Sequence, residues 1–406
     1  MRKINTRSFV RATFRTSREI NRRIALNVVR EHGPISRADL ARRMGVGRGM
    51  VTALISELLA EGSIYEGDPV NAPRGRRPTM LYVRTKDRLA IAIDVRFSRT
   101  YLMLSDLSGT EIALETFATI IDPIALADEL ATRIRRMIRH HRKAGTCQGV
   151  GLVVPGMVDH ATGRVLNAPQ VGWRDVDIRG ALAERVALPV YIEGAPIACA
   201  LGQMWLGEPG TEAPRDFAYV IVGDGVGAGV VVNGEVLRGA GYTAGEFGHV
   251  PLDIEGVPCM CGAKGCVEAY TSNLATLVRY SGHEFSPQEA RAVVQASGLT
   301  IGDVLARARG GDKQAGHAID ETARYLGIGL AGMINTLNPA RIFVGGEITA
   351  AWDRVEPILR AAVKERALTA PAANTPIVPG RTGSYPRLRG GTALVVAPQF
   401  AIPHIA

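Results

Sequence analysis

The most specific stretch of this sequence is HVPLDIEGVPCMCGAKGC, residues 249–266. It contains one imidazole and three thiols, at His249, Cys259, Cys261 and Cys266. One nitrogen and three thiolates complete a tetrahedral Zn²⁺ shell and leave no open position for a substrate. Glycines inside the stretch allow the loop to fold tightly around an ion. Three reduced cysteines without a metal are the alternative, but the spacing predicts a structural zinc site.

On both sides of this stretch, strands, helices and glycine turns alternate over residues 88–406. Apolar runs predict strands at 89–94, 100–105, 149–154, 218–222, 227–232 and 341–344. An amphipathic pattern predicts a long helix over 123–143. Several strands run into glycines, at Gly156, in the loop 223–229 and at Gly345-Gly346. This alternation is typical of the α/β class.

The charge of the chain is concentrated near its N-terminus. The whole sequence has a net charge of +9, and residues 1–88 hold 19 Lys or Arg against 8 Asp or Glu. A basic module joined to a near-neutral body indicates an anionic partner, with nucleic acid favoured over a membrane surface. A solvated basic tail is the alternative. We expect double-stranded DNA as the partner.

Residues 17–87 have the pattern of a winged helix-turn-helix, preceded by a basic arm over 1–16. Helices are predicted at 17–31, from the N-cap Ser36, and at 47–60. The third helix is expected to bury Met50, Val51, Leu54, Ile55 and Leu58 and to present a small, polar, cationic face to the major groove. A basic loop at 71–78 between two short strands would form the wing. A small helical protein-interaction domain is the alternative. The residues predicted to contact DNA are Ser36, Arg37, Arg48, Gly49, Thr52, Arg74, Arg76 and Arg77.

The motifs of the body, taken in order, resemble the ROK family of bacterial sugar kinases and sugar-responsive repressors. They are Asp94, Pro155-Gly156, the loop 223–229, the Gly245–His249 segment, the cysteine segment and Gly345-Gly346. With a winged helix in front, the chain resembles the repressor branch, which includes N-acetylglucosamine- and xylose-type repressors. The resemblance implies a two-lobed, actin- and hexokinase-like (ribonuclease H-like) body over 88–406. The first lobe would hold 88–200 and 375–406, and the second would hold 201–374 with the zinc loop.

The resemblance also implies a sugar site between the lobes. The positions that match the family's sugar contacts are Gly156, Asn167, Glu246, His249 and Glu268. Carboxylates suit this role because each accepts two hydroxyl hydrogen bonds. Glu246 and Glu268 could instead only support the zinc loop, which is the alternative interpretation.

The positions that would catalyse phosphoryl transfer differ from the family pattern. The base position, normally an Asp, is Ala195, which cannot accept a proton. Glu193 is close in sequence, but it belongs to the preceding strand and should point elsewhere. Arg96-Phe97-Ser98 and Asp224 replace small or hydroxyl residues of the phosphate loops. We therefore expect no kinase activity.

These features together predict a DNA-binding repressor of sugar-utilisation genes. Its effector would be a sugar or sugar phosphate, and it would bind a near-palindromic operator as a homodimer or tetramer. The chain has no apolar run of about 18 residues and no secretory h-region. Three of its five cysteines cluster, so a reduced cytoplasm is expected, with Cys147 and Cys199 in the core. An ATP-dependent sugar kinase, or a regulator controlled by a sugar-transport phosphotransferase protein, are the alternatives.

Overall fold

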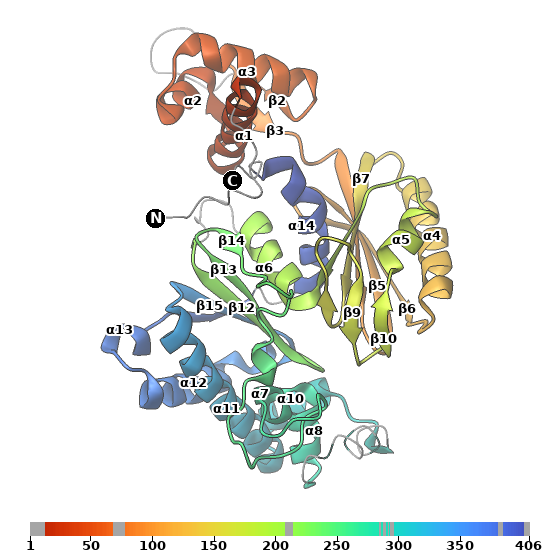
Figure 1. The fold of residues 1–406 in the computed structure, drawn as a ribbon, viewed down its shortest axis with the longest axis vertical. Coiled ribbons are helices and arrows are strands. Elements are labelled where there is room, and N and C mark those ends of the chain that lie inside the picture. Colours follow the sequence, from red (N-terminus) through yellow and green to blue (C-terminus); the bar gives the residue numbers. More distant parts are fainter. Residues whose placement is uncertain are drawn as a thin grey trace.

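The N-terminal part of the chain contains three helices and a small sheet, at the top of Figure 1. The helices are α1 (Phe14–His32), α2 (Arg37–Met44) and α3 (Arg48–Ala60). Strand β3 (Met80–Val83) pairs antiparallel with β1 (Ile35–Ser36) and β2 (Ile64–Gly67). This computed structural model describes residues 13–67, 78–207, 214–283, 286, 290, 292, 296–380 and 385–401. Arg74, Arg76 and Arg77 of the expected wing, and residues 1–12 of the expected arm, lie outside the described residues.

Two expectations for this part are wrong. Helix α1 begins three residues early because Thr13 and Thr16 form a capping box, so residues 14–16 belong to the helix and not to the arm. Met50 is 47% exposed and does not join the core. The core of this part is filled instead by Leu26, Val29, Leu40, Val51, Leu54, Ile55, Leu58, Ile64 and Leu81.

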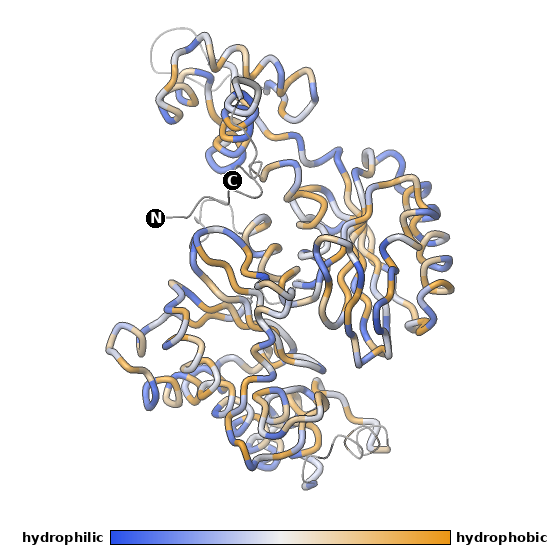
Figure 2. The backbone as a smooth tube through the Cα atoms, in the orientation of Figure 1, coloured by the Kyte–Doolittle hydropathy of each residue, from blue (hydrophilic) through white to orange (hydrophobic). Residues whose placement is uncertain are grey.

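The first half of the body is a five-stranded sheet in the order β11-β7-β4-β5-β6. The strands are β4 (Arg88–Val95), β5 (Arg99–Asp106), β6 (Glu111–Ala118), β7 (Thr146–Val154) and β11 (Val190–Gly194). One face is covered by α4 (Pro123–His140) and α5 (Ile178–Ala183), and β4 and β7 also contact the C-terminal helix α14 (Pro386–Phe400). A small sheet of β8 (Met157–Val158), β9 (Val165–Ala168) and β10 (Trp173–Val176) follows β7. The central strands β4 and β7 are largely apolar because both faces of the sheet are covered (Figure 2), and Asp94 is the buried acidic residue of β4.

The second half repeats the same strand pattern in the order β14-β13-β12-β15-β16. The strands are β12 (Phe217–Val222), β13 (Val226–Val232), β14 (Glu235–Val236), β15 (Arg341–Gly345) and β16 (Ile377–Pro379). In both sheets three antiparallel strands are extended by two parallel ones. Because β16 pairs with β15, residues 377–379 belong to the second sheet, a few residues beyond the boundary expected at about 375.

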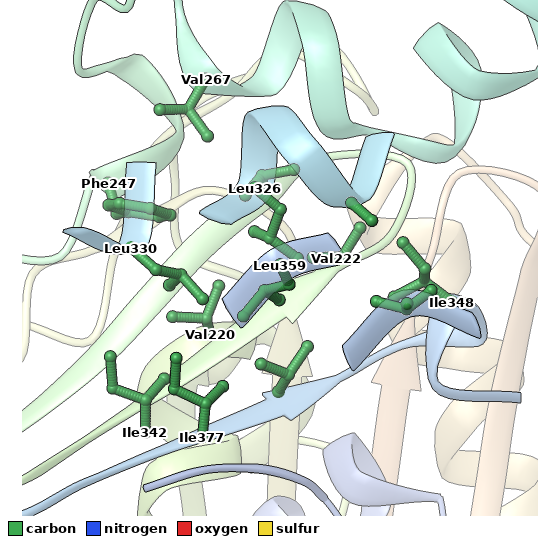
Figure 3. Close-up of a cluster of buried hydrophobic side chains, with 14 of the residues drawn as sticks. Val220, Val222, Phe247, Val267, Leu326, Leu330, Ile342, Ile348, Leu359 and Ile377 are labelled. Atoms are coloured by element: carbon green, nitrogen blue, oxygen red, sulfur yellow. The ribbon is translucent and has the colours of Figure 1, made fainter. Parts of the chain in front are cut away.

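Helices pack against the second sheet and form its core. They are α7 (Val267–Thr271), α8 (Asn273–Tyr280), α10 (Ile301–Arg309), α11 (Lys313–Leu337), α12 (Trp352–Arg366) and α13 (Ala370–Ala373), with short turns η1 (Phe247–His249) and η2 (Glu347–Ala351). Figure 3 shows Leu326, Leu330 and Leu359 above strand residues Val220 and Ile342. Phe247 and Val267, on either side of the cysteine loop, join the same cluster. The loop is therefore anchored to the core at both ends.

Helix α6 (Ala195–Leu206) connects the two halves. It follows β11 directly, packs along α14 and also contacts β12 and β13. Among the described helices none combines the length and hydrophobicity that crossing a membrane requires.

Candidate functional site

The four residues of the predicted zinc site come together in the structure. Their ligand atoms, one from each side chain, all lie within 4.8 Å of one another. His249 Nδ1 lies 3.8 Å from Cys259 Sγ, and Cys261 Sγ lies 3.8 Å from Cys266 Sγ. A tetrahedral site with Zn–S bonds of about 2.3 Å has ligands about 3.8 Å apart, so the spacing fits this ion.

The chemistry of the ligand side chains also fits a zinc ion. Burial raises the pKa of the Cys259 and Cys266 thiols, so without a cation these thiols hold their protons. A bound divalent cation would replace those protons and neutralise the thiolates. The four side chains fill a tetrahedral shell by themselves, so such an ion would hold the loop and would not activate a substrate.

The acidic residues expected to bind sugar lie next to this cluster. Glu246 Oε2 is 3.8 Å from His249 Nε2, the ring nitrogen that faces away from the thiols. Glu268 accepts a hydrogen bond from the Val226 amide at 2.8 Å through Oε2, and its Oε1 is 4.0 Å from Cys259 Sγ. Burial raises the pKa of both carboxyl groups. The His249 ring and both carboxylates therefore lie beside the cysteine cluster.

The other two expected sugar residues belong to the first half of the body. Gly156 has φ +84°, and a Cβ there would lie 2.1 Å from the Asn167 carbonyl oxygen, so only glycine fits. Asn167 is held in β9, opposite Met157 of β8. The two halves meet at Gly225, where an added Cβ would lie 2.7 Å from Gln170 Nε2 and 3.0 Å from Glu268 Oε2. Sequence reasoning missed Gln170, which follows β9 and had no motif to mark it.

The expected base position is occupied by Ala195, whose methyl side chain cannot accept a proton. Ala195 is buried and begins α6. Glu193 is 2% exposed, and its Oε2 accepts a hydrogen bond from Arg238 at 2.8 Å. Its other oxygen accepts the Gly194 amide. Arg238, also missed from the sequence, lies 45 residues further along the chain and joins Glu193 across the two halves.

A cavity of about 440 Å³ lies where the first phosphate loop meets the second sheet. Its lining includes Arg96, Tyr101, Gly346, Glu347, Tyr385 and Arg387. Arg96 donates to Asp94 Oδ2 at 2.7 Å and lies 3.7 Å from Glu347 of the second half. Its guanidinium also packs over the ring of Tyr101. Arg96 is therefore held by ion pairs at the position that matches the family's first phosphate loop.

The residues predicted to contact DNA differ in exposure and in the bonds that they form within the protein. Arg48, Gly49 and Thr52 are exposed along α3. Arg37 forms an ion pair with Glu66 of β2 at 2.9 Å. Ser36 is buried, and its hydroxyl donates to Asp39 Oδ2 at 2.6 Å while it caps α2. Its contact with DNA remains a prediction, and capping is the role that its surroundings explain.

A model of the ROK family matches residues 90–397 of the chain. The chain belongs to the ROK family. Among relatives of this ROK protein, a xylose repressor of Caldicellulosiruptor bescii is 28% identical over 395 residues, which are 96% of this chain and 98% of that repressor. The DNA-binding transcriptional dual regulator NagC of Escherichia coli is 27% identical over 368 residues, with coverage of 89% and 88%. The resemblance inferred from the motifs is confirmed.

Solved structures confirm the fold. A ROK family transcriptional regulator, described as a homologue of the Escherichia coli MLC protein, superposes with a TM-score of 0.79 at 24% identity and covers 95% of this chain and 97% of its own. A ROK glucokinase from Streptomyces griseus, solved with glucose and AMPPNP, gives a TM-score of 0.64 at 25% identity over 75% of this chain and 98% of its own. The glucokinase matches a smaller share of the chain, whereas the regulators match nearly all of it. This ROK protein is a DNA-binding transcriptional regulator of the repressor type.

Proposed function

We propose that this ROK protein represses sugar-utilisation genes and that a sugar or sugar phosphate, bound between the two halves of its body, changes its affinity for operator DNA. The observation that carries the proposal is a winged helix joined to a ROK body whose base position is Ala195. The winged helix would bind DNA, and the body would bind the effector without phosphorylating it.

The effector site would use Glu246, His249 and Glu268 from the second half and Gly156 and Asn167 from the first. The two half-buried carboxylates of Glu246 and Glu268 can each accept hydrogen bonds from vicinal hydroxyls. A Zn²⁺ held by the cysteine loop would fix the ring of His249, so that its Nε2 faces the same ligand as Glu246. Such a site selects a polyhydroxylated ring.

Phosphoryl transfer is not part of the proposal, for three reasons. Ala195 offers no base, and Glu193 is already bound to Arg238. Arg96 is held by Asp94 in the first phosphate loop. Asp224, in the second loop, would repel a phosphate. The body would thus retain the kinase fold while its catalytic machinery is lost.

Coupling between effector and DNA would pass through α6 and α14. The guanidinium of Arg30, on α1, lies 5.2 Å from the ring centroid of Trp205 and 4.7 Å from that of Phe400. Trp205 lies at the C-terminal end of α6 and Phe400 at that of α14. Asn27 of α1 also donates to the Phe400 carbonyl at 2.8 Å. Helix α6 begins at Ala195 and α14 begins beside the cavity, so a shift between the two halves would move the winged helix.

We propose that the protein acts on DNA as a homodimer, because two winged helices are needed to read the two half-sites of a near-palindromic operator. A change in the spacing of the two winged helices would then alter operator affinity, provided that the ligand prefers one arrangement.

A thermal-shift screen of the zinc-loaded chain tests the effector. Neutral sugars, amino sugars, sugar phosphates and Mg-ATP would be compared. A ligand present at 100 times its Kd should stabilise the protein by about 2.7 kcal/mol. Stabilisation by one sugar class, with none by Mg-ATP and no product in a coupled phosphorylation assay, is the expected result. Stabilisation by Mg-ATP together with product formation would favour the kinase. DNA binding with no sugar response at all would favour control by a phosphotransferase protein.

A further inference from the structure

The exposed face of α3 offers few free hydrogen-bond donors to a partner. Its exposed residues are Arg48, Gly49, Met50, Thr52, Ala53, Ser56 and Ala60. At 100° per residue, Gly49, Thr52, Ala53 and Ser56 form a central stripe, with Arg48 on one side and Met50 on the other. The opposite face, with Val51, Leu54, Ile55 and Leu58, is buried in the core. The orientation of the helix is therefore fixed by packing.

The two hydroxyls of this stripe donate to the helix itself. Thr52 Oγ1 donates to the Arg48 carbonyl at 2.9 Å, and Ser56 Oγ donates to the Thr52 carbonyl at 2.8 Å. Neither hydroxyl proton is then free for a base edge, and Thr52 presents its methyl group. Arg48 alone among these side chains brings several N–H donors that can reach a base.

The surroundings favour an anionic partner for this exposed face of α3. Glu57 forms an ion pair with Arg18, and Glu61 forms one with Arg22, so the nearest carboxylates on and after α3 are neutralised. Arg43 of the neighbouring helix α2 is exposed. A protein groove would suit the apolar side chains, but DNA suits both the side chains and the positive charge around them.

We infer that α3 reads its operator mainly through the 5-methyl groups of thymines, with Met50, the Thr52 methyl and Ala53 against those methyls and Arg48 at one guanine. The thymine methyl is the one apolar group on a base edge in the major groove. Met50 is flexible and polarizable, so it can fill the gap between two such methyls. The inference rests on the proposed function, since it names the DNA chemistry that the winged helix recognises.

The test removes single methyl groups from the DNA. The full chain would first select its site from a pool of randomised duplexes. In the selected duplex, each thymine would be replaced in turn by deoxyuridine, which keeps the hydrogen-bonding edge and lacks the methyl. Binding to each duplex would be measured by fluorescence anisotropy for the wild type, Met50→Ala and Ser56→Ala. Thermal unfolding would confirm that each variant folds.

For the wild type, removal of a methyl at one or two positions of each half-site should weaken binding about 3- to 5-fold, as expected for one buried methyl. In Met50→Ala the same removal should cost less than about 2-fold at one of these positions. Ser56→Ala should behave like the wild type, because its hydroxyl is bonded to the helix.

Three outcomes contradict the inference while DNA binding stands. The selected site could lack thymine at the half-site positions, deoxyuridine could bind as well as thymine, or Met50→Ala could retain the full methyl effect. A chain that binds every duplex equally would instead overturn the proposed function itself.

Discussion

At the scale of single residues, close backbone packing explains several glycines of the body. A Cβ at Gly151 of β7 would lie 1.9 Å from the Gly391 carbonyl oxygen of α14. Side chains at either position would push α14 away from the first sheet. Gly332 of α11 has open space around it, with no atom within 4 Å of an added Cβ. The same substitution should therefore have opposite effects at these two sites.

Gly151→Ala should destabilise the protein by about 2–3 kcal/mol, because backbone must move to make room. Gly332→Ala should stabilise it by up to about 1 kcal/mol, because alanine favours an exposed helix position. Chemical unfolding of both variants against the wild type measures the two effects. Equal effects of the two substitutions on the free energy of unfolding would show that β7 and α14 leave room for a methyl group at position 151.

At the scale of elements, the cysteine loop is a small unit whose ends are tied to the second core by Phe247 and Val267. Between these anchors the loop carries Cys261, which is exposed, and the exposed side chains Val250, Ile254 and Met260. Val257, Cys259, Cys266 and Ala269 form only a small apolar cluster at the loop, so a bound metal would add to its order.

Cys261→Ser should lower zinc affinity by at least about 100-fold, because the fourth ligand of a closed shell is lost. Cys147→Ser is the matched control, since Cys147 lies in β7, outside the cluster. Metal content after dialysis against a chelator measures the difference. Loss of zinc from both variants, or from neither, would contradict the ligand assignment.

At the scale of the whole molecule, Arg30 connects the DNA-binding part to both helices that reach the middle of the body. Burial lowers the pKa of Arg30 to about 10, which leaves it charged at neutral pH between two aromatic rings. Arg23 adds a hydrogen bond to the Pro398 carbonyl at 3.2 Å. The winged helix is thus attached to the body at the C-terminal ends of α6 and α14.

Arg30→Ala should preserve sugar binding and operator binding separately but reduce the effect of one on the other. Allosteric coupling of 5- to 150-fold is typical, and we expect it to fall to about 2-fold or less in this variant. Glu31→Gln, an exposed neighbour, should retain it. Operator affinity with and without saturating sugar measures the coupling. If the sugar changed operator affinity as strongly in Arg30→Ala as in the wild type, Arg30 would not transmit the effect.

Local patterns predicted most elements and the candidate metal ligands of this protein. Strand and helix periodicity, caps such as Ser36, and the spacing from His249 to Cys266 involve residues close in sequence, so the physics that acts on them is local. The absence of a base at Ala195 was also visible without a structure, because the side chain itself lacks the chemistry.

Packing alone decided the contacts between distant segments. The pairs Glu193 with Arg238 and Arg96 with Glu347, and the stacking of Arg30 on Phe400, join residues 45 to about 370 positions apart. Met50 fits the apolar period of α3, yet it is exposed because the core closes around Val51 and Leu54 without it. Such outcomes depend on how sheets and helices fill space together, and no periodicity within one segment encodes that.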